Sequence, residues 1–345
     1  HQKTRVFGVL GFCVLTGWAG TQTGNELQGE QSTNADFYAA PDGSDANPGT
    51  MDQPFATLGR AQEAVRKKFK GGLVKADVMV LIRGGTYQLD EPIAFGPEDS
   101  GTDQYAVIYA AYGNEEPLFS GGRRITGWRK VEDGLWQAHG AEVAAGQWWF
   151  RQLFADGRRL TRARYPNNEV YTIAVPPTNM TRVTLNRELP SQDVVGPDTE
   201  VVLFKLWATA RVPIEKLDGV TLSSAKPMGW GEEANIFHCN SVAEKETLYL
   251  EHSLAFIDQL GEWHLDRATG TLTLMLTEED NPNEMQIMAP RLEKLIAIVG
   301  QADTPVKNLR LEELRFEHTM WDLPELGYLG TQAGYHDAGG TNQTR

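Results

Sequence analysis

Beyond Lys70 the sequence consists of short runs of β-forming residues, each of which soon ends at glycine, proline or aspartate. Such runs lie at 78–82, 84–87, 92–95 and 106–110. Helices longer than one or two turns are hardly indicated in this part, and strands do not alternate with helices. A doubly wound α/β sheet is therefore disfavoured, and two all-β architectures remain, a sandwich and a stack of β-coils.

A recurrence within these runs favours the stacked coils. Val80 and Ile82 recur as Val107 and Tyr109, a spacing of 27 residues that falls in the range of solenoid repeats. Coils of this kind place alternate side chains inward, where they form one continuous apolar core.

A later segment, residues 295–316, has the same character. It has the pattern of three short strands separated by corners, with Leu309, Leu311, Leu314 and Phe316 expected to point inward. One corner is expected at Glu312-Glu313, because the alternation breaks there. We therefore predict an all-β solenoid.

One amphipathic helix is indicated over residues 57–66. Thr57 can serve as its N-cap, and Leu58, Ala61 and Val65 recur on one face. Because the terminal coil of a solenoid has an unpaired edge, we expect this helix to cover the first coil.

Residues 125–289 differ from their surroundings, with longer strands joined by tight turns, and we interpret them as an inserted antiparallel β domain. Asp156-Gly157 predicts a hairpin turn, because both central positions of such a turn favour positive φ. A second hairpin is predicted over 263–276. Seven of the nine tryptophans lie in this block, and we expect most of them to pack its core. The other sections are then 36–124 and 290–345.

The start of the chain has the pattern of a secretory signal. Lys3 and Arg5 precede an apolar run over 6–15, and small residues follow. We expect residues 1–25 to be removed on export, which leaves Cys239 alone and gives no disulfide framework. The mature protein is then expected to be secreted or periplasmic, with no membrane partner.

The charge of the chain argues against nucleic acid as a partner. With 46 acidic and 32 basic residues the formal net charge is −14. Such a surface repels phosphate backbones unless a local basic patch overrides it.

Several runs carry a family resemblance. The segment Phe37 to Leu58, together with Gly84-Gly85-Thr86-Tyr87, resembles the opening of secreted right-handed parallel β-helix proteins of carbohydrate metabolism. Four further runs, at 120–128, 157–167, 261–272 and 316–334, resemble glycoside hydrolase family 141 with its insertion domain. The match runs from about Asp36 to Gly334.

The resemblance implies a pectate-lyase-like right-handed parallel β-helix and an exported fucosidase or xylanase that acts by a two-carboxylate mechanism. It also implies that the later coils, with the catalytic carboxylates, lie beyond Arg345. The chain is then expected to be the N-terminal portion of a hydrolase and to be inactive by itself.

Candidate site residues gather near the end of the last coil. Glu317 and Asp337 are the candidate catalytic carboxylates, since glycoside cleavage needs two such groups beside the bond. The combination of a broad aromatic face with hydrogen-bonding groups suits a sugar, and the candidate substrate-binding residues are His318, Trp321, Tyr328, Gln332 and His336. The alternative is that Trp321 and Tyr328 pack the loop onto the solenoid. No zinc or calcium spacing is present, so we expect no metal and no cofactor.

Two other functions remain open. A polysaccharide lyase on the same fold would use a Lys or Arg base and release unsaturated products. A non-catalytic carbohydrate-binding module would retain glycans and release no reducing sugar.

Overall fold

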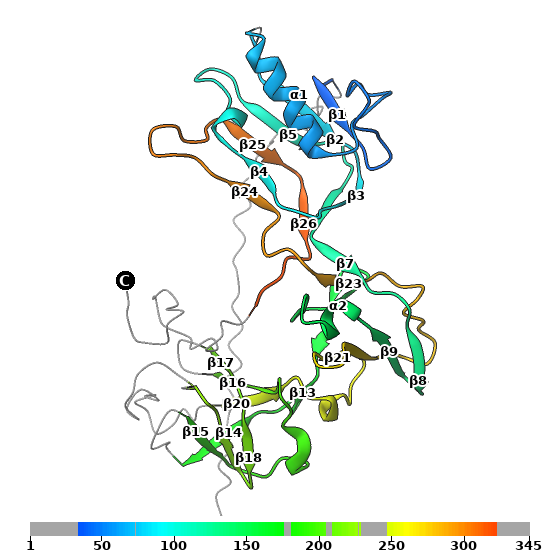
Figure 1. Cartoon of the computed structure of the whole chain (residues 1–345), viewed down its shortest axis with the longest axis vertical. Helices are drawn as coiled ribbons and strands as arrows, with labels where there is room; N and C mark the ends of the chain where they lie inside the picture. The colour runs from blue at the N-terminus through cyan, green and yellow to red at the C-terminus, as the bar shows by residue number, and fades with distance from the viewer. Residues whose placement is uncertain are drawn as a thin grey trace, which may run out of the picture.

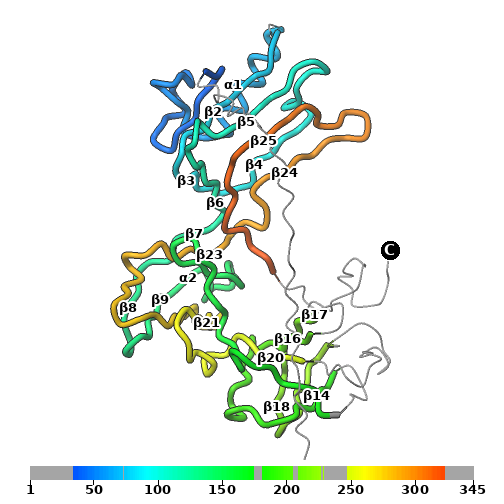
Figure 2. Tube along the Cα trace, turned by 180° about the vertical axis from the view of Figure 1, so that it is seen from behind, coloured from blue at the N-terminus to red at the C-terminus, as the bar shows by residue number. Residues whose placement is uncertain are grey.

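The computed structural model describes residues 34–322, except 73, 176–180, 205–208, 227 and 229–246. The described chain is mostly β-structure, with the α-helices α1 (Leu58–Lys70) and α2 (Ala141–Ala144) and short 3-10 helices at Pro97–Asp99, Gln192–Val194 and Leu254–Phe256. Groups of strands follow one another along the long axis in Figure 1, and Figure 2 shows the same order from behind. The predicted all-β class is confirmed.

Strands from both ends of the described chain form three parallel sheets. The first contains β1 (Phe37–Ala39), β2 (Val78–Ile82), β5 (Val107–Ala111) and β25 (Leu309–Glu312); the second contains β3 (Gly85–Gln88), β6 (Pro117–Ser120) and β26 (Arg315–Glu317); the third contains β4 (Ile93–Phe95) and β24 (Ile296–Ile298). From β2 the chain enters them in the order first, second, third, first, second. After residues 122–290 it resumes with third, first, second. The later strands therefore continue the cycle that the earlier ones began.

The pairing of β2 with β5 corrects the predicted repeat. Val80 lies opposite Tyr109, so the repeat here is 29 residues instead of 27. Because alternate residues of a strand share a face, a difference of two residues keeps the same side chains inward. Val80 and Tyr109 are indeed fully buried. The hydrophobic pattern specifies which face is inward, and the length of the intervening loop decides the pairing.

The core between these sheets is aromatic along the second sheet. Tyr87 stacks on Phe119 with ring centroids 4.9 Å apart, and Phe119 stacks on Phe316 at 5.6 Å. One ring comes from each of β3, β6 and β26. Phe316 faces the core ring of Phe119, as predicted, but its other side is open and the residue is 40% exposed. The corner predicted at Glu312-Glu313 is present, and Glu313 has a φ of 57°.

Helix α1 lies against β1 and packs its apolar face on the same core. The Thr57 side chain accepts a hydrogen bond from the Arg60 backbone N–H, which confirms the predicted N-cap. The helix runs to Lys70, four residues beyond the predicted end. Phe69 is partly buried against the core. The positive charges of the lysines in the last turn interact favourably with the negative end of the helix dipole and stabilise that turn. These interactions account for the extra turn.

The strands between the two groups of parallel strands pair antiparallel, apart from β12 with β21. β7 (Gly122–Arg124) pairs with β23 (Ile287–Pro290) at the place where the chain leaves and re-enters the region of the parallel sheets. The other edge of β23 pairs with β10 (Phe154–Ala155), which forms a hairpin with β11 (Arg158–Arg159). A second sheet contains β8 (Arg129–Glu132), β9 (Leu135–His139), β12 (Thr161–Arg162), β21 (Glu262–Asp266) and β22 (Thr271–Met275). A third contains β13 (Arg164–Tyr165), β14 (Tyr171–Val175), β15 (Arg182–Leu185), β16 (Glu200–Phe204), β17 (Thr209–Pro213), β18 (Lys216–Asp218), β19 (Thr221–Ser223) and β20 (Thr247–Glu251).

Both predicted hairpins are present in this region. Asp156 and Gly157 have φ values of 47° and 76°, as the turn between β10 and β11 requires. β21 and β22 form the second hairpin. Local turn chemistry was therefore sufficient to locate these elements.

Most tryptophans that the structure describes in this region pack its core, as predicted. Trp128 and Trp263 are buried, and Trp136 and Trp148 pack partly buried against the same cluster. Trp207 and Trp230 lie outside the described residues. Trp149 is not part of that cluster.

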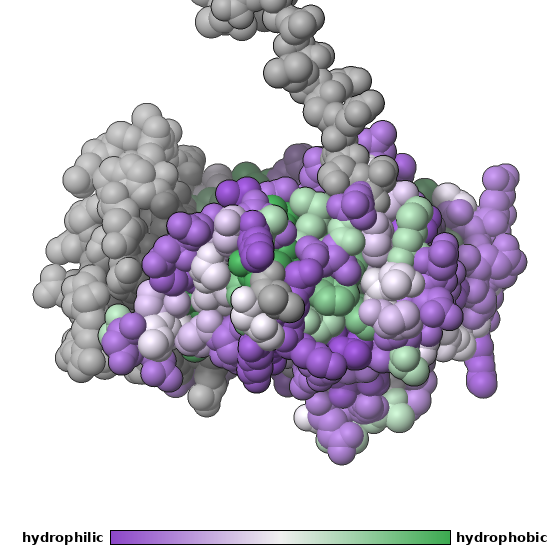
Figure 3. Space-filling model, turned by 90° about the horizontal axis from the view of Figure 1, so that it is seen from above, coloured by the Kyte–Doolittle hydropathy of each residue, from purple (hydrophilic) through white to green (hydrophobic). Residues whose placement is uncertain are grey.

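Seen from the end that carries α1, the surface is mostly hydrophilic around a smaller group of apolar side chains (Figure 3). No helix among the described residues is long and apolar enough to span a membrane. The predicted signal segment, residues 1–25, lies outside the described residues.

Candidate functional site

A buried cluster of opposite charges lies where β12, β16 and β20 meet. We call it the arginine–glutamate network: Arg151, Arg162, Arg211, Glu200 and Glu251. Arg151 donates to both carboxylate oxygens of Glu200, and Arg162 Nη1 donates to Glu251 Oε1 over 2.9 Å. Burial acts to raise the pKa of Glu200, but the hydrogen bonds from Arg151 and the charge of Arg162 hold that pKa below its usual value. The network therefore holds Glu200 in its ionised form between Arg151 and Arg162.

Two tryptophan rings flank the outer end of this network. The Arg151 guanidinium lies 5.6 Å from the Trp149 ring centroid and 5.2 Å from that of Trp321. Arg267 lies 4.1 Å from the Trp149 centroid. We call Trp149, Trp321, Arg151 and Arg267 the tryptophan–arginine stack. Cations at such positions are attracted to the ring faces, so the buried network holds both indoles in place.

Hydrogen bonds fix the stack further. Trp149 Nε1 donates to Asp322 Oδ2 over 3.1 Å. Gln152 bonds both backbone groups of Trp321, accepting from its N–H at 3.3 Å and donating to its carbonyl at 3.2 Å. Trp321 is nevertheless 43% exposed. A rigid, accessible aromatic face is what stacking on a sugar ring requires.

Two adjoining pockets open beside the stack. The stack pocket, of about 590 Å³, is lined by Trp148, Trp149, Asp198, Arg267 and Arg291 among others. The histidine pocket, of about 620 Å³, is lined by Asp198, His252, His264 and Asp266 among others. Both include Pro197, Asp198 and Ala268, so the two pockets adjoin.

The groups in these pockets have shifted pKa values. Burial raises the pKa of Asp198, against the opposing charges of Arg267 and Arg162. Burial also lowers the pKa of His252 well below its usual value and that of His264 to about 4. Both imidazoles are therefore neutral at pH 7 and can donate and accept hydrogen bonds.

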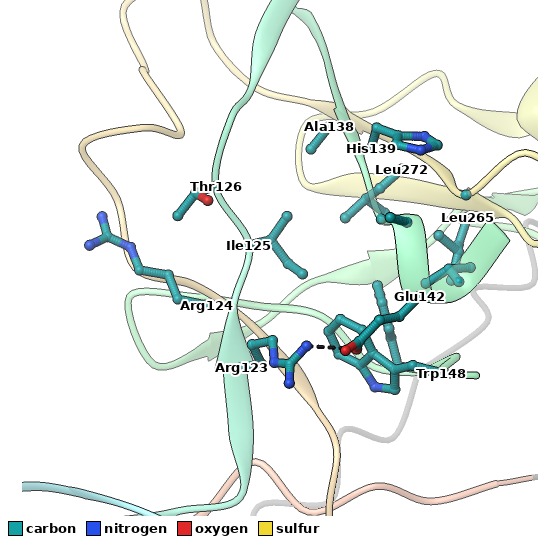
Figure 4. A pocket seen from close by; sticks show the side chains of 15 residues that line it. Arg123, Arg124, Ile125, Thr126, Ala138, His139, Glu142, Trp148, Leu265 and Leu272 are labelled. Carbon is teal, nitrogen blue, oxygen red and sulfur yellow. Dashed lines mark hydrogen bonds and ion pairs between the residues drawn. The ribbon is translucent and has the colours of Figure 1, made fainter. Parts of the chain in front are cut away.

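A smaller pocket, of about 280 Å³, shares Trp148 with the stack pocket. Figure 4 shows Glu142 pointing toward Arg123 beside the Trp148 ring. Leu265 and Leu272 line its apolar part. The other polar residues of its lining, Arg124, Thr126 and His139, lie away from this ion pair in Figure 4.

The candidate residues predicted from sequence separate in the structure. Trp321 belongs to the stack. His318 is buried, where its Nδ1 lies 2.8 Å from Ser120 Oγ, and Phe154 packs edge-on against its ring. Glu317 accepts a hydrogen bond from Arg315 over 2.5 Å.

The other four candidates, Tyr328, Gln332, His336 and Asp337, lie outside the described residues. Among those described, no group of three or more His, Cys, Asp or Glu side chains is arranged to hold a metal ion.

Four residues at these pockets were not predicted from the sequence: Trp149, Asp198, Arg267 and Arg291. The available signal was the doublet Trp148-Trp149, because consecutive side chains of an extended segment point to opposite sides and both rings are then hard to bury in one core. The arginines and Asp198 carried no signal in the sequence, since they meet the tryptophans only through long-range packing.

The structure resembles that of a solved protein described as a glycoside hydrolase, with a TM-score of 0.70 and 25% sequence identity. The alignment covers 84% of this chain and 51% of that one, so the chain spans about half the length of that protein. A second solved structure, titled "The complex structure of XylC with xylose", has a TM-score of 0.35 and 15% identity over 84% of this chain and 36% of its own.

Among curated proteins, the uncharacterized protein YwoF of Bacillus subtilis (strain 168) is 34% identical over 92 residues, which is 27% of this chain and 17% of YwoF. No family model matches the chain. The chain is therefore similar in fold to a protein described as a glycoside hydrolase.

Proposed function

We propose that this protein is a polysaccharide-active glycoside hydrolase, related to family 141, and that its tryptophan–arginine stack contacts the polysaccharide. The observation that carries the proposal is the similarity in fold to a glycoside hydrolase over 84% of the chain. The exposed face of Trp321 beside Trp149 supports the contact with sugar. Export to the periplasm or the medium, inferred from residues 1–25, is part of the same proposal.

The three parallel sheets are, in this proposal, the first coils of a right-handed parallel β-helix. The repeated order in which the chain enters the sheets supports it, as does the place of α1 on the core. The antiparallel strands of 125–289 are an inserted domain between β6 and β24, and 36–124 and 290–345 are the two parts of the helix.

Catalysis is proposed to follow the two-carboxylate mechanism of glycoside hydrolases, in which one group protonates the leaving oxygen. Glu200 is a poor candidate for that acid, because the hydrogen bonds from Arg151 and the charge of Arg162 hold its pKa below the usual value. Glu317 and Asp337 stay predictions from the sequence: Glu317 is itself paired with Arg315, and Asp337 lies outside the described residues. The tryptophans bind and orient the glycan, and the carboxylates carry out the reaction.

Affinity gel electrophoresis in xylan and in fucosylated polysaccharide tests the proposal. Trp149→Ala and Trp321→Ala are each expected to weaken retention about tenfold, since loss of one ring costs roughly 1.4 kcal/mol. Phe204→Ala is the matched control, because Phe204 is 39% exposed and belongs to neither pocket. If no polysaccharide in the gel retards the protein, or if all three variants are retarded alike, the proposed contact is wrong.

The reaction products separate the remaining functions. Saturated reducing ends support the hydrolase, whereas products that absorb in the ultraviolet, as unsaturated uronates do, identify a lyase. Retention without any released sugar, also in the protein that includes its natural flanking sequence, identifies a binding module.

A further inference from the structure

Two arginines in the stack pocket each lie against a tryptophan. Arg267 is 4.1 Å from the Trp149 ring centroid, and Arg291 is 5.9 Å from that of Trp148. Their side chains are 47% and 40% exposed, so solvent and ligands reach them. Close packing on an indole fixes a guanidinium, and its planar fork of N–H donors matches the oxygens of a carboxylate or sulfate.

The acidic partners of Arg267 and Arg291 engage only some of the N–H donors of these two arginines. Glu142 Oε2 accepts from both Arg123, over 2.6 Å, and Arg291, over 2.7 Å. One carboxylate thus serves two guanidinium groups. Asp198 lies 3.5 Å from Arg267, at the outer limit of a hydrogen bond.

The residues that line the pocket itself carry more positive than negative charge. Its lining includes two guanidinium groups, of Arg267 and Arg291, and one carboxylate, of Asp198. Two further carboxylates lie beside it: Glu142 is bonded to Arg123 and Arg291, and Asp322 is bonded to Trp149 Nε1. A positive excess at this place stands out in a chain with a formal net charge of −14. An anionic polymer is repelled by most of such a surface and is attracted here.

We propose that the stack pocket binds an anionic sugar unit, through the carboxylate of a uronic acid or the oxygens of a sulfate ester. The anionic group bridges the free N–H donors of Arg267 and Arg291, and the sugar ring lies against Trp149. The volume of about 590 Å³ is within the range of small-ligand pockets. This inference rests on the proposed function and specifies its substrate class.

A neutral sugar fits the same place less well. Hydroxyl groups make weaker hydrogen bonds to guanidinium than ionised oxygens do, roughly by a factor of two. They also leave the excess charge without a counter-ion, whereas an anionic unit supplies one.

Paired ligands test the inference directly. The intact protein is titrated with glucuronoxylan and with carboxyl-reduced glucuronoxylan, and separately with a sulfated fucan and its desulfated form. We expect one anionic ligand to bind at least tenfold more tightly than its neutral counterpart, and the pair that shows the difference identifies carboxylate or sulfate. The preference should decline as salt is added.

Variants place the effect at the pocket. Arg267→Gln and Arg291→Gln are each expected to lose about tenfold in affinity for the anionic ligand and little for the neutral one. Arg182→Gln, at an exposed position on β15, is the matched control and should change neither. Arg267→Lys keeps the charge without the fork, so an intermediate loss is expected from it even if a Gln variant folds poorly.

The outcomes distinguish this inference from the proposed function. Equal binding of charged and neutral ligands, with weakening by Trp149→Ala, overturns the anionic subsite and leaves the carbohydrate contact in place. The subsite is also overturned if Arg182→Gln loses as much of the preference for the anionic over the neutral ligand as the pocket variants do. Failure of every ligand to bind overturns both.

Discussion

At the residue scale, the buried charged side chains determine both the stability of this protein and the geometry of its candidate site. Arg151 and Glu200 are both almost inaccessible to solvent, with side-chain exposures of 2% and 4%. Desolvated ions of this kind are tolerated only when each meets an opposite charge with good hydrogen bonds. The arginine–glutamate network meets that condition, and it lies directly behind Trp149 and Trp321. Stability and the geometry of the candidate site are therefore linked through the same side chains.

Replacement of Glu200 by Gln should be strongly destabilising. The change leaves Arg151 and Arg162 with one ionised partner fewer, and breaking such a buried pair costs about 3 kcal/mol. Urea unfolding at pH 7 measures the loss. Glu169→Gln is the control, since Glu169 pairs with Arg187 at the surface with 68% exposure and its loss should leave the urea midpoint in place. Equal midpoints for the two variants would contradict the role given to the network.

His264 should make stability fall in mild acid. Burial lowers the folded-state pKa of His264 from 6.5 to about 4. The charge of Asp266 opposes this lowering, and the charge of Arg162 adds to it. The ring of His252 lies 4.7 Å from that of His264. The unfolded chain therefore binds a proton that the folded chain excludes, so this contribution is complete above pH 6.5 and is lost as the pH falls toward 4.

Between pH 7 and pH 5 the loss due to His264 should be about 1 to 2 kcal/mol in urea unfolding. His264→Gln should flatten that dependence, and His139→Gln, at an exposed position on β9, should not. The interpretation fails if the slope of the wild-type protein persists in His264→Gln.

At the scale of elements, α1 illustrates how local chemistry sets a boundary. Thr57 Oγ1 accepts from the Arg60 N–H over 3.1 Å and donates to Asp45 Oδ2 over 2.8 Å. The Asp45 carboxylate also accepts the backbone N–H groups of Ala56 and Thr57. The first turn is thereby tied to the loop that precedes it.

Thr57→Ala should lower the free energy of unfolding by about 1 kcal/mol, the usual cost of losing an N-cap oxygen. Thr57→Ser keeps the hydroxyl and should restore most of that stability. Thermal unfolding of the three proteins measures both effects, and a Ser variant as unstable as the Ala variant would show that packing of the Thr methyl group dominates.

The same elements show how far the sequence specified the fold. The N-cap at Thr57, the turn at Asp156-Gly157 and the corner at Glu313 each depend on a few adjacent residues, and all three were predicted. The register of β2 against β5 depends on the conformation of the loop between them, and its repeat was misjudged by two residues.

The candidate site was harder to predict because its members come from distant segments. Trp321 was predicted as a ligand-binding residue, but Arg151, whose guanidinium lies over both its ring and that of Trp149, is 170 residues earlier in the chain. Nothing in the local sequence of Asp198 or Arg267 distinguishes it from ordinary surface charge. Only the fold places these side chains beside one another.

At the scale of the whole molecule, two separate cores support the proposed domain insertion. One contains Val80, Ile82 and Phe119 and lies between the parallel sheets. Another contains Leu203 and Leu248 and lies in the antiparallel sheet that includes β14, β16 and β20. The two sets of buried side chains have no member in common, which suggests that each part can lose its structure without the other.

Hydrogen exchange on two core variants tests this independence. Leu203→Ala and Ile82→Ala each remove a fully buried aliphatic side chain, at a cost of about 2 to 5 kcal/mol. Leu203→Ala should accelerate amide exchange in β14, β16 and β20 and leave β2 and β5 protected, whereas Ile82→Ala should do the reverse. Because the variants are matched in size and burial, each serves as the control for the other. If either one accelerates exchange equally in both sets of strands, the chain unfolds as one unit and the proposed boundaries at 125 and 289 do not separate independent domains.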